Sequence, residues 1–145
     1  MINKFEGEYN FLSNFYPSQI TIDSVTYPTV EHAFQAAKTR SFLERIRISK
    51  LDTPGKAKSA GRKVELRSDW EKIKDQVMYD CLKEKFKIEE LKDKLLATGN
   101  EELIEGTTWH DNYWGNCSCE KCKNIEGKNM LGKILMRVRE ELRNE

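Results

Sequence analysis

Residues 27–38 read Tyr-Pro-Thr-Val-Glu-His-Ala-Phe-Gln-Ala-Ala-Lys, and in this stretch the chain passes from strand to helix. Before it, residues 20–22 alternate apolar and polar side chains, and Asp23-Ser24 forms a turn signal that leads back into a second short strand. Within it, apolar side chains recur at helical spacing after Thr29, which is a suitable N-cap. The stretch therefore predicts a hairpin that runs directly into a helix.

Helical patterns dominate the rest of the chain. Thr53 followed by Pro54 starts one helix, and residues 68–71, Ser-Asp-Trp-Glu, have the spacing of a capping box that opens another. A shorter helix is expected over 89–97, and a small strand at Leu103-Ile104. The last helix buries one apolar stripe, made of Leu131, Ile134, Leu135, Val138 and Leu142. Short strands followed by several helices predict an α+β fold that is predominantly helical, with a small N-terminal hairpin.

Length and composition fit one soluble domain. The chain has 145 residues, of which 38% are hydrophobic and 34% charged, and no repeat or linker divides it, so we expect a single compact domain over 1–145. The net charge of +1 excludes a global field that would recruit nucleic acid. No apolar run approaches the roughly 18 residues of a membrane span. The polar N-terminus is unlike a signal peptide, so we expect a cytoplasmic protein without a membrane partner.

Glu31 is the first candidate for chemistry. With Gln35 and Lys38 it forms a polar stripe along the flank of the helix that follows Thr29. Periodicity alone favours a solvated stripe that serves solubility. The hairpin ends immediately before Glu31, however, and this places the carboxylate at a strand-to-helix junction, where the positive end of the helix dipole favours its ionised form.

Residues 107–115, Thr-Thr-Trp-His-Asp-Asn-Tyr-Trp-Gly, form the second concentration of reactive groups. A carboxyl group framed by aromatic rings loses solvent, which suits Asp111 as a general acid; the alternative is that Asp111 and Asn112 simply make a turn. We expect Trp109 to be a core residue, whereas Trp114 fits a core or a binding role equally. We interpret this segment and the Glu31 helix as opposite walls of one site.

Three of the four cysteines lie close together after this segment. Cys117, Cys119 and Cys122 can supply three thiolates to a structural zinc ion, with His110 as a fourth ligand. The alternative is a surface loop with free thiols, and for His110 an ordinary loop histidine or a catalytic base. The fourth cysteine, Cys81, has the position of a small buried hydrophobe.

Residues 54–63 carry four cations beside two glycines. The spacing is not that of a P-loop. A helix terminus together with Arg62 would still make a cradle for an anion. A solvated, charged face explains the same segment equally well.

Seven blocks of the sequence together resemble the YbiA-like (NADAR) family, in that family's order and over residues 11–142. They are Phe11–Phe15, Tyr27–Lys38, Gly61-Arg62, Asp69-Trp70, Leu95–Gly99, Asp111–Gly115 and Gly127–Gly132. The resemblance implies a compact, mostly helical α+β domain with N-glycosidase activity. Some members of the family hydrolyse early riboflavin-pathway intermediates, and others remove ADP-ribose from guanine in nucleic acid.

The resemblance also implies site residues. It makes Glu31 and Asp111 the catalytic carboxylates and places Trp70, which periodicity assigns to the core, and Trp114 in the same pocket. It further suggests that Asn14, Lys38 and Arg62 surround the ribose and phosphate. The chain departs from the family between Gly115 and Gly127, where the cysteine cluster replaces a glycine-rich loop.

The expected reaction is hydrolysis of the N-glycosidic bond between a phosphorylated ribose and a heterocyclic base or amine. It requires no cofactor. The first substrate class is a ribosylaminopyrimidine phosphate of early riboflavin biosynthesis. Two alternatives are an ADP-ribosyl glycohydrolase that acts on guanine in DNA or RNA, with nucleic acid as partner, and a non-catalytic module that binds ADP-ribose or NAD. Oligomeric state has no signature in the sequence.

Overall fold

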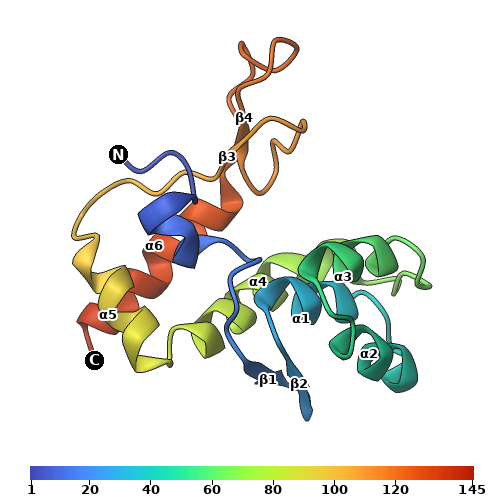
Figure 1. Cartoon of the computed structure of the whole chain (residues 1–145). Helices are drawn as coiled ribbons and strands as arrows, with labels where there is room; N and C mark the ends of the chain where they lie inside the picture. The colour runs from blue at the N-terminus through green and yellow to red at the C-terminus, as the bar shows by residue number, and fades with distance from the viewer. The chain divides into compact units, whose positions relative to one another are not determined.

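The structure, a computed structural model, describes all residues, 1–145. Six α-helices, one 3₁₀ helix and two small sheets make up the chain, and Figure 1 labels most of them. This confirms the predominantly helical α+β class. The chain forms two compact units, a central unit of Asn14–Ile88 and a terminal unit of Met1–Ser13 with Glu89–Glu145. The single domain over 1–145 stays a prediction.

The central unit begins with the predicted hairpin. Strands β1 (Ile20–Ile22) and β2 (Val25–Tyr27) pair antiparallel, with Ile20 opposite Tyr27. Asp23 and Ser24 connect them with φ values of 48° and 70°. Two successive left-handed residues give a turn whose twist matches that of the flanking strands, so this short link suffices.

Helix α1 (Val30–Ala36) follows the hairpin, as predicted, and the hydroxyl of Thr29 accepts the N–H of His32 at 3.1 Å as its N-cap. Three helices of the same unit pack against α1. They are α2 (Phe42–Ser49), α3 (Pro54–Gly61) and α4 (Trp70–Lys85). Because these helices enclose it, every residue of α1 is buried.

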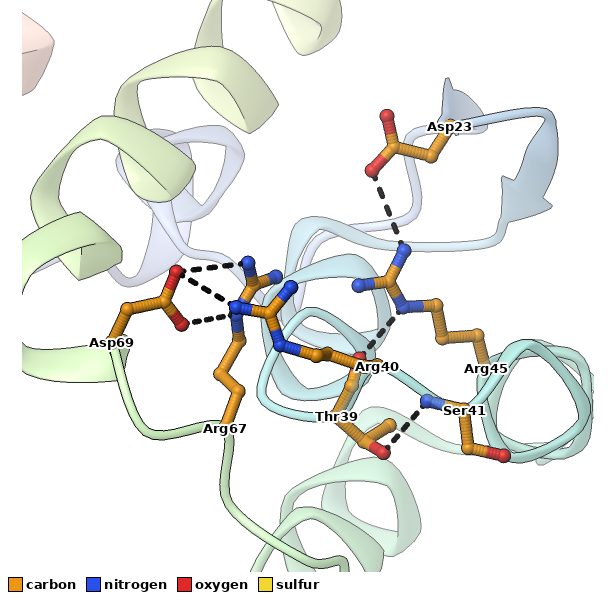
Figure 2. Close-up of polar contacts among 7 residues, drawn as sticks. All are labelled: Asp23, Thr39, Arg40, Ser41, Arg45, Arg67 and Asp69. Atoms are coloured by element: carbon orange, nitrogen blue, oxygen red, sulfur yellow. Dashed lines mark hydrogen bonds and ion pairs between the residues drawn. The ribbon is translucent and has the colours of Figure 1, made fainter.

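The start of α4 differs from the capping-box prediction, which is wrong. The helix begins at Trp70, its N-cap is Asp69, and no side chain caps it. The Asp69 carboxylate is taken up instead by Arg67, whose Nε donates at 2.7 Å, and by Arg40 at 3.2 Å (Figure 2). A cap bond from a carboxylate would be charge-assisted as well, but the two arginines hold both oxygens of Asp69, which keeps them from the helix N–H groups.

The terminal unit contains the 3₁₀ helix η1 (Gly7–Leu12) and helices α5 (Glu89–Ala97) and α6 (Met130–Arg143). All five apolar residues predicted for the last helix are buried, and burial of such a side chain stabilises the fold by about 1.5–3 kcal/mol. No helix of the chain combines the length and apolar character needed to cross a membrane.

Strands β3 (Gly106–Thr107) and β4 (Asn116–Cys117) form a parallel pair in the terminal unit. The strand expected at Leu103-Ile104 is absent, because Leu103 makes only an isolated bridge with Ile2. Asn129 fixes this region from the start of α6: its Oδ1 accepts the N–H of Glu105 at 3.0 Å, and its Nδ2 donates to the carbonyl of Leu103 at 2.8 Å. The loop that carries Asp111 connects β3 to β4, so the pairing of these strands holds both of its ends.

Candidate functional site

Glu31 is a buried carboxylate and not part of a solvated stripe. Only 7% of the residue is exposed, and Gln35, one turn later in α1, is 5% exposed. Gln35 Nε2 donates to Glu31 Oε1 at 2.8 Å, while the Glu31 N–H donates to the carbonyl of Asn14 at 3.1 Å. The first turn of α1 adds the favourable end of the helix dipole. The carboxylate is therefore oriented by neighbours before any ligand binds.

Gly61, at the end of α3, allows this arrangement. A Cβ atom on Gly61 would stand 1.9 Å from Gln35 Oε1 and 2.8 Å from Gln35 Cδ. Only a residue without a side chain lets α3 lie this close to α1 while Gln35 keeps its bond to Glu31. Gly61 and Gln35 thus position the carboxylate, although sequence analysis had given neither residue a role in the site.

Asn14 supplies a polar group beside the same helix. Its Nδ2 contacts Met78 Sδ at 3.6 Å, and its Oδ1 is buried without a hydrogen-bond donor from the protein. A buried carbonyl oxygen is costly unless it accepts a hydrogen bond, and ribose hydroxyl groups are donors of the kind that it needs.

The indole of Trp70 packs edge-on against Phe34 of α1, with ring centroids 5.1 Å apart and an interplanar angle of 61°. Trp70 is 6% exposed, so the sequence-based assignment to the core is confirmed. The pocket role implied by the resemblance remains a prediction. Such an edge-to-face pair adds stability beyond simple burial, and it ties α4 to the helix that carries Glu31.

Positive charge gathers around Lys38, which is half-buried just after α1. Burial lowers the pKa of Lys38, the Glu31 carboxylate opposes that change, and Arg62 and Lys58 lower the pKa further. Two further cations therefore act on Lys38, and the Glu31 carboxylate counters them. Such a group favours a multiply charged anion such as a phosphate. Lys58 is a member that sequence analysis did not single out.

Asp111 and Trp114 lie in the terminal unit, on the loop between β3 and β4. Asp111 Oδ1 accepts the N–H groups of Tyr113 at 3.1 Å and Trp114 at 2.9 Å, so the turn considered for Asp111-Asn112 is present. Trp114 is half-buried and packs edge-on against Tyr113 with centroids 4.9 Å apart. The turn fixes the position of the Asp111 carboxyl group. Its role in catalysis stays a prediction.

Trp109 is not a core residue, and that prediction is wrong. The residue is 55% exposed, whereas Cys117 and Cys122 in the same region are buried. The interior of this loop is occupied by the cysteines and not by the indole, which explains why an apolar residue lies outside.

The four candidate metal ligands converge. The ligand atoms of His110, Cys117, Cys119 and Cys122 all lie within 4.8 Å of one another, so the cluster could hold a metal ion. No cysteine of the chain forms a disulfide. Cys81 is fully buried in α4, as predicted.

The buried His32 ring has a structural role in the central unit. His32 Nδ1 lies 2.7 Å from the Thr29 hydroxyl and Nε2 lies 2.9 Å from the carbonyl of Leu51, so the ring ties α1 to the segment after α2.

A separate hollow of about 370 Å³ is lined in part by Arg40 and Arg67. Figure 2 shows both guanidinium groups directed at Asp69, whose one carboxylate offsets one of their two positive charges.

The structure therefore gathers most of the predicted site residues into two groups. In the central unit the Asn14 carbonyl accepts the N–H of Glu31, and Lys38 interacts with both Glu31 and Arg62. Trp70 packs against Phe34 of the same helix. The terminal unit places Asp111 and Trp114 on one loop. The convergence of the two groups on one substrate stays a prediction.

Comparisons with known proteins match nearly the whole chain. The sequence model of the NADAR domain family matches residues 2–143. The chain is 41% identical over 138 residues to N-glycosidase YbiA of Escherichia coli, covering 93% of this chain and 82% of that protein. The NMR structure of YbiA superposes with a TM-score of 0.81 at 37% identity, covering 99% of this chain and 88% of the other.

Two further relatives carry informative names. An N-glycosidase of Nostoc punctiforme is 38% identical over 142 residues, covering 94% of this chain and 87% of that protein. A riboflavin biosynthesis protein of Vibrio vulnificus is 36% identical over 140 residues, covering 94% of this chain but 36% of that longer protein.

Proposed function

The chain belongs to the NADAR domain family, and from this premise we propose that it is an N-glycosidase acting on a phosphorylated ribosyl compound. The names of the YbiA and Nostoc relatives support the class of bond. The observation that carries the proposal is the Glu31 carboxylate, buried, held by Gln35, and adjoined by cations.

The chemistry follows from the bond that breaks. Cleavage of a ribosyl C–N bond builds positive charge on the anomeric carbon, and two carboxyl groups divide the work of stabilising it. Glu31 stays ionised, stabilises the developing cation and orients the attacking water. Asp111 binds ribose hydroxyls or protonates the departing nitrogen. The reaction consumes water, requires no cofactor, and releases a ribose phosphate and a base or amine.

Binding uses the remaining predicted residues. Lys38 and Arg62 hold the phosphate, which fixes the sugar relative to Glu31. Asn14 Oδ1, a buried acceptor, receives a ribose hydroxyl. Trp114 or Trp70 stacks on the heterocycle, worth roughly 1–3 kcal/mol by analogy with stacking of bases on aromatic side chains.

The first substrate class we propose is a ribosylaminopyrimidine phosphate of early riboflavin biosynthesis. The name of the Vibrio relative supports it. Removal of ADP-ribose from guanine in DNA would need a similar pocket with a basic rim open to nucleic acid, and a binding module for ADP-ribose or NAD would need no pair of carboxylates.

One experiment separates these functions. The protein is incubated with a ribosylaminopyrimidine phosphate, its dephosphorylated form, and DNA carrying ADP-ribosylated guanine, and released base and sugar are quantified by mass spectrometry. We expect turnover of the first compound, loss of turnover in Glu31→Gln with binding retained, and normal turnover in Glu89→Gln. Glu89 is the matched control, because it is an exposed glutamate in the first turn of α5.

Three results would contradict the proposal. Release of ADP-ribose from DNA alone would favour the second function, and tight binding of ADP-ribose without any cleavage would favour the third. Full activity in the Glu31→Gln enzyme would refute the role of that carboxylate whatever the substrate.

A further inference from the structure

We propose that His110, Cys117, Cys119 and Cys122 form a closed, four-ligand zinc site that fixes the loop carrying Asp111 and Trp114. All four ligand atoms lie within 4.8 Å of one another. His110 Nδ1 lies 3.2 Å from Cys119 Sγ and 3.4 Å from Cys122 Sγ. Zn–S bonds of about 2.3 Å and a Zn–N bond of about 2.0 Å in a tetrahedron place nitrogen and sulfur about 3.5 Å apart. The two nitrogen–sulfur distances are therefore close to those of a zinc centre.

The β3–β4 pair builds this site. Thr107 lies opposite Cys117 in the parallel register, and the N–H of Ser118 donates to the carbonyl of Thr107 at 2.9 Å. The chain leaves β3, reaches His110 three residues later, and returns to Cys117 in β4. His110 itself has a φ of 67°, a region that is uncommon for residues other than glycine but more frequent for histidine than for most.

The surroundings of the sulfurs suit thiolate ligands. The backbone N–H of His110 donates to Cys117 Sγ at 3.2 Å. Asn112 Oδ1 accepts the N–H of Cys117 at 2.9 Å and so fixes the backbone of that ligand. The N–H of Cys122 donates to the carbonyl of Cys119 at 3.0 Å, closing a turn between the last two ligands. Hydrogen bonds that orient ligands in this way are typical of metal sites.

The ligand set identifies the ion and its role. Three thiolates and one imidazole are preferred by zinc, and four protein ligands complete its usual coordination. A site with no coordination position left for water is structural and not catalytic. A disulfide is a poorer explanation, because three cysteines cannot all pair and Cys81 is buried in the other unit.

The loop connects the ion to the candidate site. Asp111 directly follows the ligand His110, and Asp111 Oδ1 holds the N–H groups of Tyr113 and Trp114. A bound ion therefore fixes Asp111 and Trp114 together. Zinc binding itself does not depend on the proposed glycosidase function, whereas an effect of zinc on turnover rests on that function.

Metal analysis of the full-length protein, purified under reducing conditions from medium supplemented with zinc, tests the site. We expect one zinc per chain in the wild type and in Cys81→Ala, which removes the one cysteine outside the cluster. Cys119→Ser should lose most of the metal. Replacement of zinc by cobalt should give the visible absorption bands of a tetrahedral site with thiolate ligands, a result that does not depend on activity.

A thiol titration of the wild type keeps the test decisive if Cys119→Ser does not fold. We expect zinc release to accompany modification of three thiols. Absence of zinc from protein whose thiols are all reduced would overturn the proposal, as would one iron per chain, or full zinc content in Cys119→Ser. One zinc per chain without hydrolysis of any ribosyl compound would leave the metal site standing and remove the proposed function.

Discussion

Substitution of Gly61 by alanine should impair the enzyme without touching a substrate. A Cβ at this position would lie 1.9 Å from Gln35 Oε1, 2.8 Å from Gln35 Cδ and 2.9 Å from Gln35 Cβ. Because even the Cβ of Gln35 is too close, rotation of the amide alone does not relieve the overlap. Gln35 must move, and its 2.8 Å bond to Glu31 Oε1 is lost.

The size of the effect follows from that bond. A hydrogen bond to a charged group contributes about 1.5–3 kcal/mol, and each 1.36 kcal/mol in the barrier changes the rate tenfold. We therefore expect kcat/KM to fall about 10- to 150-fold on the best ribosyl phosphate substrate, measured by steady-state release of the free base. Gly55→Ala in the same helix is the matched control, because its new Cβ would meet only Thr53 Oγ1 at 3.9 Å.

A double-mutant cycle shows whether the effect passes through Gln35. In a Gln35→Ala background the amide and its bond to Glu31 are already gone, and only the 2.9 Å contact with the Cβ of residue 35 remains, so Gly61→Ala should cost less activity there than in the wild type. Equal losses from Gly61→Ala with and without Gln35 would refute this reasoning, as would unchanged activity in a Gly61→Ala protein that folds normally.

Three further predictions concern other parts of the chain. Arg62→Ala should raise KM about tenfold or more for a phosphorylated substrate and leave KM for the dephosphorylated compound unchanged. Parallel steady-state assays on the two compounds measure this difference. Burial lowers the pKa of His32 below its ordinary value of 6.5, although the bond to Leu51 opposes that shift. The folded state then binds fewer protons at His32 than the unfolded chain does. The stability that the neutral ring contributes is therefore present above about pH 6.5 and is lost as pH falls through the folded pKa. On acidification, the urea midpoint of unfolding should fall less in His32→Gln than in the wild type. Asn129→Ala should lower the free energy of unfolding by roughly 2–4 kcal/mol, because two hydrogen bonds at a buried position are lost, and a urea midpoint equal to wild type would contradict this.

Local signals were sufficient for much of the fold. The Asp23-Ser24 turn, the N-cap at Thr29 and the apolar stripe of α6 all depend on residues close together in sequence, and all three were predicted correctly. The start of α4 was missed because the Asp69 carboxylate is held by Arg67, two residues before it, and by Arg40, which lies far from it in the chain. The spacing of a capping box does not reveal that these arginines compete for the carboxylate.

The candidate site was harder to predict for the same reason. Helical periodicity identifies the face that carries Glu31, but it does not reveal that other helices cover that face as well. Gly61 had no visible role until α3 was seen against Gln35. Trp109 was misassigned because composition marks a tryptophan as buried, whereas the buried positions of that loop belong to cysteines.

Enclosure of α1 on all sides has a consequence for how such a protein can evolve. Helices at a protein surface have one side where substitutions are tolerated, so tolerance rises and falls every three to four positions. Seven successive positions of α1 lack such a side, and a saturation mutagenesis scan should show an unbroken block of intolerance there. Divergence toward new substrates would then have to begin in the loops, with this short segment inherited almost unchanged.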